Sequence, residues 1–498
     1  MALRNWLQSL RTNPVQQTVR KPRPRLRVQL LEDRAVPAAG FLSAFTTGGA
    51  STIDGSNAND VAVDAAGNTY LTGSFIGTID FEPTDPTDAA DTLTARGSTD
   101  AFVAKYAPND TLVWVRRMGG DAAGGGTTDC GRKLAIDASG NAYVTGQFKE
   151  SGDFGPFTLT SAANQDGFVM KLDASGGVAW AKSFGAGMND TGLGIGVDAA
   201  GNVYALGVRT DPAATTTVSP NNGHDIFKFS PAGTLVWTRS FATRWQNSSG
   251  DMAVDAAGNV YAVGSFQGAI DFDPGNGTQL FASGYWSDAF VLKLTSAGNY
   301  GWATTFYGLG SGSTGGYSHA QSVALDGAGN VIVSGYYGYS VDFNPGRGTT
   351  TLPSGGGAFI TKLSNKGALV WAKALELVSS GSTMVYGLAV DSAGSIYATG
   401  SFSSTVDFDP GIGTHSRTSS GASDVFVVKV NSAGTFQWAE TIGGTSDDFG
   451  WGVAVSSTGV VHLTGSIMGT VDFDPDPLAT HELSVNRRSL FLLKLNQS

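Results

Sequence analysis

The sequence predicts an all-β fold, a seven-bladed β-propeller built from four-stranded antiparallel blades. Three observations lead to this prediction. One motif recurs seven times along the chain, each repeat contains two short turn signals, and residue size changes systematically from the start of a repeat to its end. Regular recurrence of one unit indicates a single repeat architecture rather than several unrelated domains.

The recurring motif reads MAVDAAGNVYAVGSF at residues 252–266, and its turn position returns at intervals of 57 to 73 residues. The seven turn positions are occupied by Asp64, Asp137, Asp198, Asp255, Asp326, Asp391 and Ser456. A glycine near the end of a short connection that begins with aspartate supplies the positive φ that a hairpin turn requires. The motif therefore indicates two antiparallel strands joined by a tight turn.

Four strands are expected in each repeat. In the fourth repeat the strand-like runs are residues 252–255, 260–266, 289–294 and 300–306. The first two runs are joined by the turn AAGN, and the last two by the turn TSAGN. Two tight hairpins in each repeat predict a four-stranded antiparallel meander.

Residue size distinguishes a propeller from a solenoid. The first strand of each repeat is rich in alanine, glycine and valine, whereas the fourth strand of six repeats carries a tryptophan. These tryptophans are Trp114, Trp180, Trp237, Trp302, Trp371 and Trp438. Blades converge at the axis of a propeller and diverge at its rim, so small residues suit the inner strand and large residues fill the outer wedge.

The two ends of the repeat region predict how the ring closes. The last repeat stops with its third strand at residues 491–498, without a fourth strand after it. Residues 39–49 (AGFLSAFTTGG) resemble the fourth-strand segment 434–444 (GTFQWAETIGG). We expect the N-terminal strand to complete the last blade, because closure removes exposed sheet edges. The propeller is therefore expected to span residues 40–498.

Composition excludes some classes of partner. Of the net charge of −11, residues 1–39 carry about +6, which leaves about −17 on the remainder and argues against nucleic acid as a partner. No apolar run reaches 18 residues, so no transmembrane helix is expected. The single cysteine, Cys130, cannot form an internal disulfide. We expect a monomer.

The repeat as a whole resembles a known family. The pattern G-G-x-x-x-D, then [VL]-A-[VIL]-D-x-x-G-N-x-Y-x-x-G, then D-x-F-V-x-K-L-x-x-x-G-x-x-x-W is similar to the bacterial SBBP repeat, named for seven-bladed β-propellers. The resemblance covers about residues 41–498. It implies an extracellular or surface-associated protein that binds or acts as a scaffold without catalysis. The seventh repeat departs from the pattern, since Ser456 and Val460 replace the usual turn residues.

The N-terminal segment differs from the repeats. Residues 1–39 are basic and are expected to form a disordered arm, because prolines interrupt any helix. Residues 25–38 (RLRVQLLEDRAVPA) resemble a short leader ending in LEDR-x-x-PA, which precedes many secreted and cell-surface proteins of one bacterial group. The resemblance implies export. The alternative is a solvated basic tail with no role.

Variable loops are the expected place of function. In an up-and-down blade the short turns share one face, whereas the connections between strands two and three and between blades share the other. The candidate ligand-binding residues are aromatic side chains on or near this variable-loop face: Trp451, Tyr386, Trp286 and Tyr337. The first two precede inner strands and should lie near the channel mouth, where rings can stack on sugars. The alternative is that these aromatics only pack between loops.

Paired carboxylates open several of the loops between strands two and three. The candidate calcium ligands are Asp271, Asp273, Asp407, Asp409, Asp472 and Asp474. Residues i and i+2 of an extended chain point the same way, so each pair can converge while the intervening phenylalanine turns inward. The alternative is that each aspartate accepts backbone N–H bonds in a turn. Calcium is the one cofactor that the sequence suggests.

One lysine position is repeated in every third strand. It is occupied by Lys105, Lys171, Lys228, Lys293, Lys362, Lys429 and Lys494. A catalytic site would break the symmetry of the ring, so recurrence in all seven repeats indicates a structural role.

The chemistry of the sequence favours binding over catalysis. The five histidines are scattered, and the paired carboxylates recur in several repeats instead of forming a single catalytic pair. We therefore predict a non-enzymatic extracellular or cell-surface module that binds a surface polysaccharide or a protein. The alternatives are a propeller lyase or glycosidase with its site at the channel mouth, and a purely structural component of the cell envelope.

Overall fold

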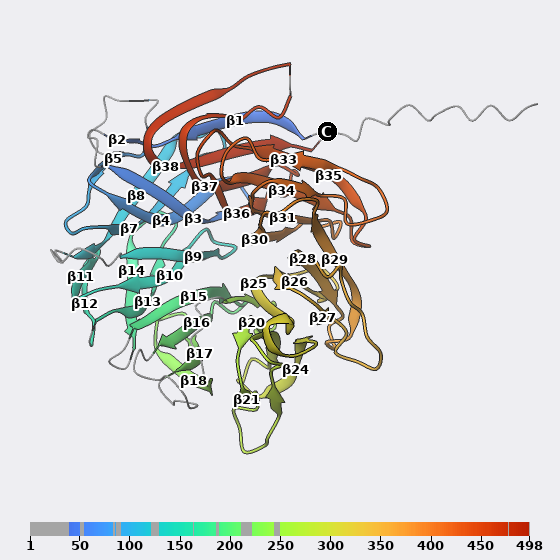
Figure 1. Ribbon diagram of the computed structural model, residues 1–498. Coiled ribbons are helices and arrows are strands. Elements are labelled where there is room, and N and C mark those ends of the chain that lie inside the picture. Colours follow the sequence, from blue (N-terminus) through green and yellow to red (C-terminus); the bar gives the residue numbers. More distant parts are fainter. Residues whose placement is uncertain are drawn as a thin grey trace, which may run out of the picture. The chain divides into compact units, whose positions relative to one another are not determined.

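The computed structural model describes residues 39–49, 54–82, 85, 91–120, 129–162, 164–185, 189–210, 222–243, 250–476 and 478–497. The basic N-terminal arm lies outside these residues. Figure 1 shows antiparallel sheets that follow one another around a central axis in sequence order, and seven of the sheets contain the principal strands of the blades. The predicted all-β, seven-bladed propeller is therefore confirmed.

Each blade contains four principal strands, numbered here from the axis outward. Blade 1 contains β3 (Gly55–Val63), β4 (Thr69–Ile76), β7 (Asp100–Tyr106) and β8 (Leu112–Gly120). Blade 2 contains β9 (Cys130–Ile136), β10 (Ala142–Phe148), β13 (Asp166–Leu172) and β14 (Val178–Phe184). Blade 3 contains β15 (Asn189–Val197), β16 (Val203–Thr210), β17 (Gly223–Phe229) and β18 (Leu235–Ala242).

The second half of the ring repeats this order. Blade 4 contains β19 (Gly250–Val254), β20 (Val260–Phe266), β23 (Asp288–Leu294) and β24 (Tyr300–Gly308). Blade 5 contains β25 (Tyr317–Leu325), β26 (Val331–Gly338), β28 (Gly357–Leu363) and β29 (Leu369–Leu377). Blade 6 contains β30 (Thr383–Val390), β31 (Ile396–Phe402), β34 (Asp424–Val430) and β35 (Phe436–Ile442).

Blade 7 combines the first and the last strands of the described residues. It contains β36 (Phe449–Val455), β37 (Val461–Asp472) and β38 (Glu482–Asn496), and its outer strand is β1 (Gly40–Thr46). Strands β1 and β38 pair antiparallel, with Gly40 opposite Asn496 and Thr46 opposite Phe491. The Gly40 N–H also donates to Asn496 Oδ1 at 2.9 Å. The predicted closure by the N-terminal strand is confirmed.

The aspartate of the repeated motif builds the turn between the first two strands. In blade 1, Asp64 Oδ1 accepts the N–H groups of Ala66 and Asn68, and Asp64 Oδ2 accepts the Asn68 amide and the Tyr70 hydroxyl. Burial raises the pKa of Asp64, but these hydrogen bonds outweigh burial and lower the pKa overall. The same arrangement occurs at Asp137 and Asp198.

Tryptophan and glycine join neighbouring blades at the rim. Trp114 Nε1 donates to the carbonyl of Ala174 in the next blade at 3.2 Å. Gly176 in that turn has a φ of +81°, and a Cβ there would lie 2.7 Å from Trp114 Cδ2, so glycine lets the turn lie on the ring. Equivalent contacts are made by Trp180 with Gly233, Trp237 with Gly298, Trp302 with Gly367 and Trp371 with Gly434.

The repeated lysines also link blades. Lys105 Nζ lies 4.9 Å from the ring centroid of Tyr70 within blade 1. Lys494 Nζ in blade 7 reaches blade 1, where it donates to the Pro108 carbonyl at 3.0 Å and pairs with Asp110 at 2.5 Å. Its stem runs through buried surface, as the predicted structural role requires.

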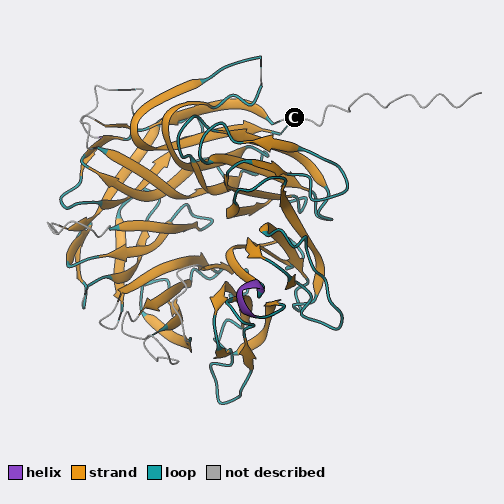
Figure 2. Ribbon diagram, viewed as in Figure 1, coloured by secondary structure: helices purple, strands orange, loops and turns teal. Residues whose placement is uncertain are grey.

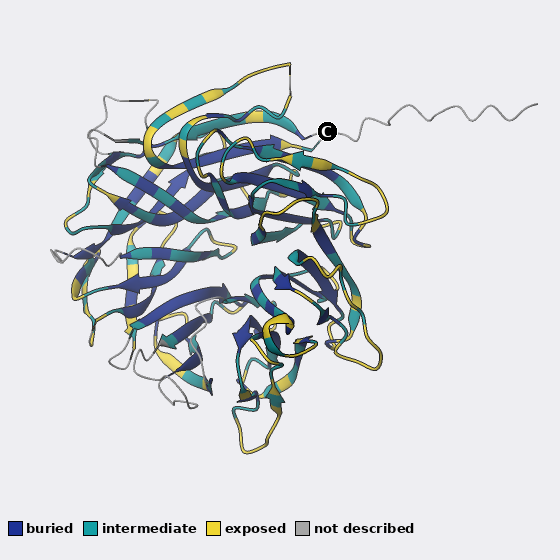
Figure 3. Cartoon of the chain, viewed as in Figure 1, coloured by how far each residue is buried: buried dark blue, intermediate teal, exposed yellow. Residues whose placement is uncertain are grey.

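Small residues allow the inner strands to converge. A Cβ on Gly194 would lie 2.6 Å from the Met252 nitrogen of the next inner strand, and a Cβ on Gly452 would lie 3.0 Å from the Val61 nitrogen. Figure 3 shows the burial that results, with long buried stretches in the strands of each sheet and exposed residues concentrated in loops and outer strands. The core is therefore a set of layers between adjacent blades.

The connections between strands two and three contain short strands that the sequence analysis did not predict. They are β5 (Thr78–Asp80), β6 (Thr92–Thr94), β11 (Ser151–Phe154), β12 (Phe157–Thr160), β21 (Ala269–Asp271), β22 (Leu280–Ala282), β27 (Val341–Asp342), β32 (Thr405–Asp407) and β33 (Ser416–Thr418). Four of these strands pair with a segment of the preceding blade: β5 with β2 (Gly48–Gly49), β11 with β8, β27 with β24 and β32 with β29. They therefore fasten successive blades together on the variable-loop face.

Helical structure is minimal in the described residues. The 3-10 turn Gly312–Thr314 interrupts the loop between blades 4 and 5, and it is the purple segment in Figure 2. In this part of the chain no helix is long and apolar enough to cross a membrane.

Candidate functional site

One residue from each inner strand lines a cavity of about 240 Å³ at the centre of the ring. Each of these residues stands five positions before the turn residue of its repeat. The seven residues are Asn59, Arg132, Leu193, Gly250, Gln321, Tyr386 and Trp451, and Cys130 and Lys133 complete the lining. The cavity is therefore the axial channel of the propeller, and its wall has a different side chain in every blade.

β-bulges direct these side chains into the channel. The pairing of strands one and two shifts register at this position in six blades, whereas blade 4 pairs without a shift and carries Gly250 there. A bulge leaves one residue unpaired and re-aims its side chain. Aligned repeats carry the signal for this site, since the seven repeats place seven different residues at this position.

Two predicted ligand-binding residues meet in the channel wall. The rings of Tyr386 and Trp451 lie 4.5 Å apart at an interplanar angle of 42°, and Phe449 stacks on Trp451 at 5.5 Å. The Trp451 Nε1 is buried and has no hydrogen-bond partner in the described part of the chain. The expected position needs correction, because both residues lie within inner strands β36 and β30 instead of before them. The bulges, which were not foreseen, explain how strand residues reach the channel.

A charged cluster lies beside the aromatic pair. Lys133 Nζ lies 3.5 Å from Asp251 Oδ2 and 4.0 Å from Asp60 Oδ1, so one lysine links blades 1, 2 and 4. Burial raises the pKa of Asp60 to about 6, although the Lys133 charge and the Leu134 N–H lower it. The Ser322 hydroxyl donates to Asp251 Oδ2 at 2.9 Å. The cluster is asymmetric, since the equivalent positions of the other blades carry glycine or serine.

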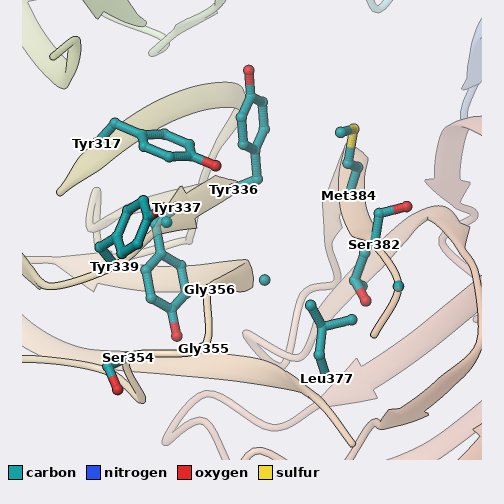
Figure 4. Close-up of a pocket in the computed structure, with 14 residues that line it drawn as sticks. Tyr317, Tyr336, Tyr337, Tyr339, Ser354, Gly355, Gly356, Leu377, Ser382 and Met384 are labelled. Carbon is teal, nitrogen blue, oxygen red and sulfur yellow. The ribbon is translucent and has the colours of Figure 1, made fainter. Parts of the chain in front are cut away.

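A second pocket, of about 360 Å³, lies between blades 5 and 6. Figure 4 shows Tyr317, Tyr336 and Tyr339 on one side of this tyrosine pocket and Met384 on the other. Tyr317 lies 6.5 Å from Tyr336 and 6.4 Å from Tyr339 between ring centroids. Tyr337, the third predicted ligand-binding residue, lines the pocket but is buried, and its hydroxyl donates to the Pro353 carbonyl at 2.8 Å.

The tyrosine pocket adjoins the channel. The Tyr386 hydroxyl donates to Met384 Sδ at 3.1 Å, and Met384 lines the pocket. Burial, and then the charges of Tyr317 and Tyr386, raise the pKa of Tyr336. An aromatic band therefore runs over blades 5 to 7, from Tyr339 through Tyr317, Tyr336 and Tyr386 to Trp451.

Trp286, the fourth predicted ligand-binding residue, lies elsewhere. Its side chain is exposed, packs edge-on against Tyr285 at 5.4 Å, and donates from Nε1 to the Gly312 carbonyl at 3.3 Å. It lines neither of the two cavities described above. The structure brings Trp451 and Tyr386 together and leaves Trp286 on a separate loop.

The carboxylate loops have the hydrogen bonds of turns. Asp407 Oδ1 accepts the N–H groups of Asp409 and His415, and Asp409 Oδ1 accepts the Gly411 N–H at 2.7 Å. The candidate ligands Asp271, Asp273, Asp472 and Asp474 repeat this arrangement in two further blades. As predicted, the intervening phenylalanines are fully buried: Phe272, Phe408 and Phe473.

A chelator experiment tests the calcium prediction. Among the described residues no group of three or more His, Cys, Asp or Glu side chains converges as a metal site would require. Because one oxygen of each aspartate already accepts N–H bonds, we expect the melting temperature to be unchanged between excess EDTA and excess calcium. A rise with calcium that Asp407→Asn and Asp409→Asn abolish would instead support binding, and magnesium serves as the control ion.

The fold and the axial cavity together define a seven-bladed propeller with a candidate binding site at its centre. No protein-family model matches the chain, so the resemblance to the SBBP repeat remains a prediction. An uncharacterized WD repeat-containing protein of Acanthamoeba polyphaga mimivirus is 23% identical over 273 residues, which cover 45% of this chain and 19% of that protein. Regulatory protein FlaEY of Caulobacter vibrioides is 25% identical over 408 residues, which cover 76% of this chain and 40% of that protein. The match thus spans less than half of the length of either relative.

Solved structures show similarity at low sequence identity. The Neurospora crassa Pan2 WD40 domain has a TM-score of 0.36 and 8% identity, and the match covers 74% of this chain and 89% of that chain. A Dyadobacter fermentans protein of unknown function has a TM-score of 0.39 and 11% identity, covering 93% and 100% of the two chains. A Synechocystis apocarotenoid oxygenase has a TM-score of 0.35 and 8% identity, covering 91% and 95%.

Proposed function

We propose that this protein is a non-enzymatic binding module that recognises a glycan through its axial channel and the adjoining aromatic band. The observation that carries the proposal is the Tyr386–Trp451 pair. The pair lines a cavity to which every blade contributes a different residue. A scaffold needs only the repeated contacts between blades. A wall in which each blade contributes different chemistry can instead fit a specific ligand.

Aromatic rings favour a sugar over a generic apolar ligand. Tyr386 and Trp451 offer ring faces, while Gln321 offers an amide in the same wall. Pyranose rings present an apolar face and a polar rim, so a combination of rings and hydrogen-bonding groups matches both. The tyrosine pocket extends this surface and supplies further rings for the next units of a chain.

The location of the protein follows from the same proposal. The leader-like segment 25–38 supports export, and a surface or extracellular position would place the channel in contact with polysaccharides. The alternative partner is a protein at the same surface, recognised through the aromatic band.

The charged cluster favours a second candidate, a propeller lyase or glycosidase. Asp60, Lys133 and Asp251 form an asymmetric group at the channel, as a single catalytic site would. However, only Lys133 belongs to the cavity lining, and it is linked to both carboxylates. Binding is therefore favoured. Depolymerisation of a bound glycan by the wild type, but not by Asp251→Asn, would favour the enzyme instead.

A glycan array probed with the full chain tests the proposal. We expect binding to a defined set of glycans and a loss of about 10- to 100-fold in affinity for the Trp451→Ala/Tyr386→Ala variant, since removing stacked rings costs ~1–3 kcal/mol. Trp286→Ala is a matched control that removes an exposed tryptophan outside both cavities. Absence of binding by the folded wild type would favour the structural alternative, an envelope component.

A further inference from the structure

Among the described residues of the channel wall, one cation has no carboxylate partner. Lys133 is paired with two aspartates, whereas Arg132, its neighbour in the chain, has no ion pair among the described residues. The Arg132 Nε donates to Gln147 Oε1 at 3.1 Å, and the two terminal nitrogens of the guanidinium have no hydrogen-bond partner in the described part of the chain. Arg132 therefore presents an unused pair of donors to the cavity that it lines.

The fixed position of Arg132 makes these donors useful. The residue occupies the β-bulge of β9, equivalent to Tyr386 in β30 and Trp451 in β36, so all three are re-aimed to the same ring of the channel. The bond from Nε to Gln147 holds the guanidinium plane, and a planar guanidinium with two free donors suits the two oxygens of a carboxylate.

A second group in the wall also lacks a partner. The Trp451 Nε1–H is buried and makes no hydrogen bond within the described residues, which is unfavourable. Around the cavity, the wall offers the Arg132 guanidinium and the rings of Trp451 and Tyr386. The space is smaller than the ~300 Å³ at which pockets for drug-sized molecules begin. It accommodates one sugar unit better than several.

We propose that the channel binds the carboxylate-bearing sugar of an acidic polysaccharide, a uronic acid, with the carboxylate on Arg132 and the sugar ring against Trp451 and Tyr386. This inference rests on the proposed glycan-binding function and adds the class of sugar. An acidic peptide would also satisfy the guanidinium. The ring faces and the amide of Gln321 favour a pyranose instead.

The test compares ligands that differ only in charge. Calorimetry and tryptophan fluorescence on the full chain would measure the binding of di-galacturonic acid and of its methyl ester. The same comparison would be made with di-glucuronic acid and its methyl ester. We expect one acid to bind at least ~10-fold more tightly than its ester, because a charge-assisted bidentate contact is lost on esterification. We expect the preference to weaken as the salt concentration rises.

Three variants assign this preference to Arg132. Arg132→Gln should reduce the acid-to-ester ratio to about one, and Arg132→Lys should keep part of it, since lysine retains the charge but not the fork. Arg347→Gln removes the same charge from an exposed loop and should leave the ratio unchanged. Circular dichroism would verify that each variant is folded.

The outcomes separate this inference from the proposed function. Equal binding of acid and ester that is lost with Trp451→Ala would overturn the uronic-acid inference and leave glycan binding intact. Preference for the acid that persists in Arg132→Gln would overturn it as well. Arg132-dependent binding of an oligo-glutamate peptide without uronate binding would make the partner an acidic protein. Absence of binding to every sugar would overturn both proposals.

Discussion

A chain that begins at Thr47, and therefore lacks β1, is expected to lose more than about 5 kcal/mol of unfolding free energy relative to a chain that begins at Ala39. Without β1, strand β38 loses its partner along the whole outer edge of blade 7. Phe41 packs in the cluster that contains Trp438, and Phe45 lies 5.0 Å from Tyr106 of blade 1. Truncating a large core side chain costs ~2–5 kcal/mol, so the loss of two half-buried rings together with the whole pairing of β1 accounts for a loss of this size.

Urea denaturation followed by tryptophan fluorescence would measure this difference. A peptide of residues 39–49 added in trans should restore part of the lost stability, because it supplies the missing strand without changing the chain. The same peptide with Phe41 and Phe45 replaced by alanine is the matched control. If the shortened chain unfolded at the same urea concentration as the longer one, closure by β1 would contribute nothing to stability.

The second large loss of stability is expected when the buried phenylalanine of a carboxylate loop is truncated. Phe408→Ala should destabilise the protein by ~3–5 kcal/mol, because the ring is fully buried and lies 5.0 Å from Phe426 and 5.2 Å from Phe402. Asp409→Ala should lower the free energy of unfolding by less than ~1.5 kcal/mol, since the Asp409 carboxylate accepts the N–H of Gly411 in an exposed turn.

Phe408→Leu is the control for cavity formation in this experiment. Leucine refills part of the space, so we expect it to retain more stability than alanine does. The measurement is again the midpoint and slope of urea denaturation. Equal losses for Phe408→Ala and Asp409→Ala would show that the carboxylate stabilises the loop as much as the ring does, which a metal or another buried partner would explain.

Most of the fold could be predicted because the repeat encodes it locally. The predicted strand at residues 260–266 matches β20, and closure by the N-terminal strand followed from a missing fourth strand in the last repeat. The short strands such as β5 and β32 were missed because three residues carry no periodicity. Their partners also lie in another blade, about 30 residues away in the chain for β5 and β2.

The binding site was less predictable for a physical reason. The fold is encoded by residues that recur in every repeat, whereas most of the channel wall is formed by a position whose residue differs in every repeat. Trp451 and Tyr386 were identified as single aromatics, but their neighbour Arg132 was not, because its exposure to the channel depends on a bulge that periodicity does not reveal. Tyr337 and Trp286 were chosen by the same aromatic criterion. The structure shows their hydroxyl and indole groups bonded to loop carbonyls.

The closure of blade 7 also determines the face of the propeller at which β1 begins and β38 ends. Gly40 at the start of β1 pairs with Asn496 at the end of β38, and both lie at the face of the short turns, where Lys494 contacts Pro108. The inner strands begin at the opposite, variable-loop face. A surface tethered at Gly40 or Asn496 would therefore lie on the short-turn side of the propeller, and the variable-loop face would point away from it.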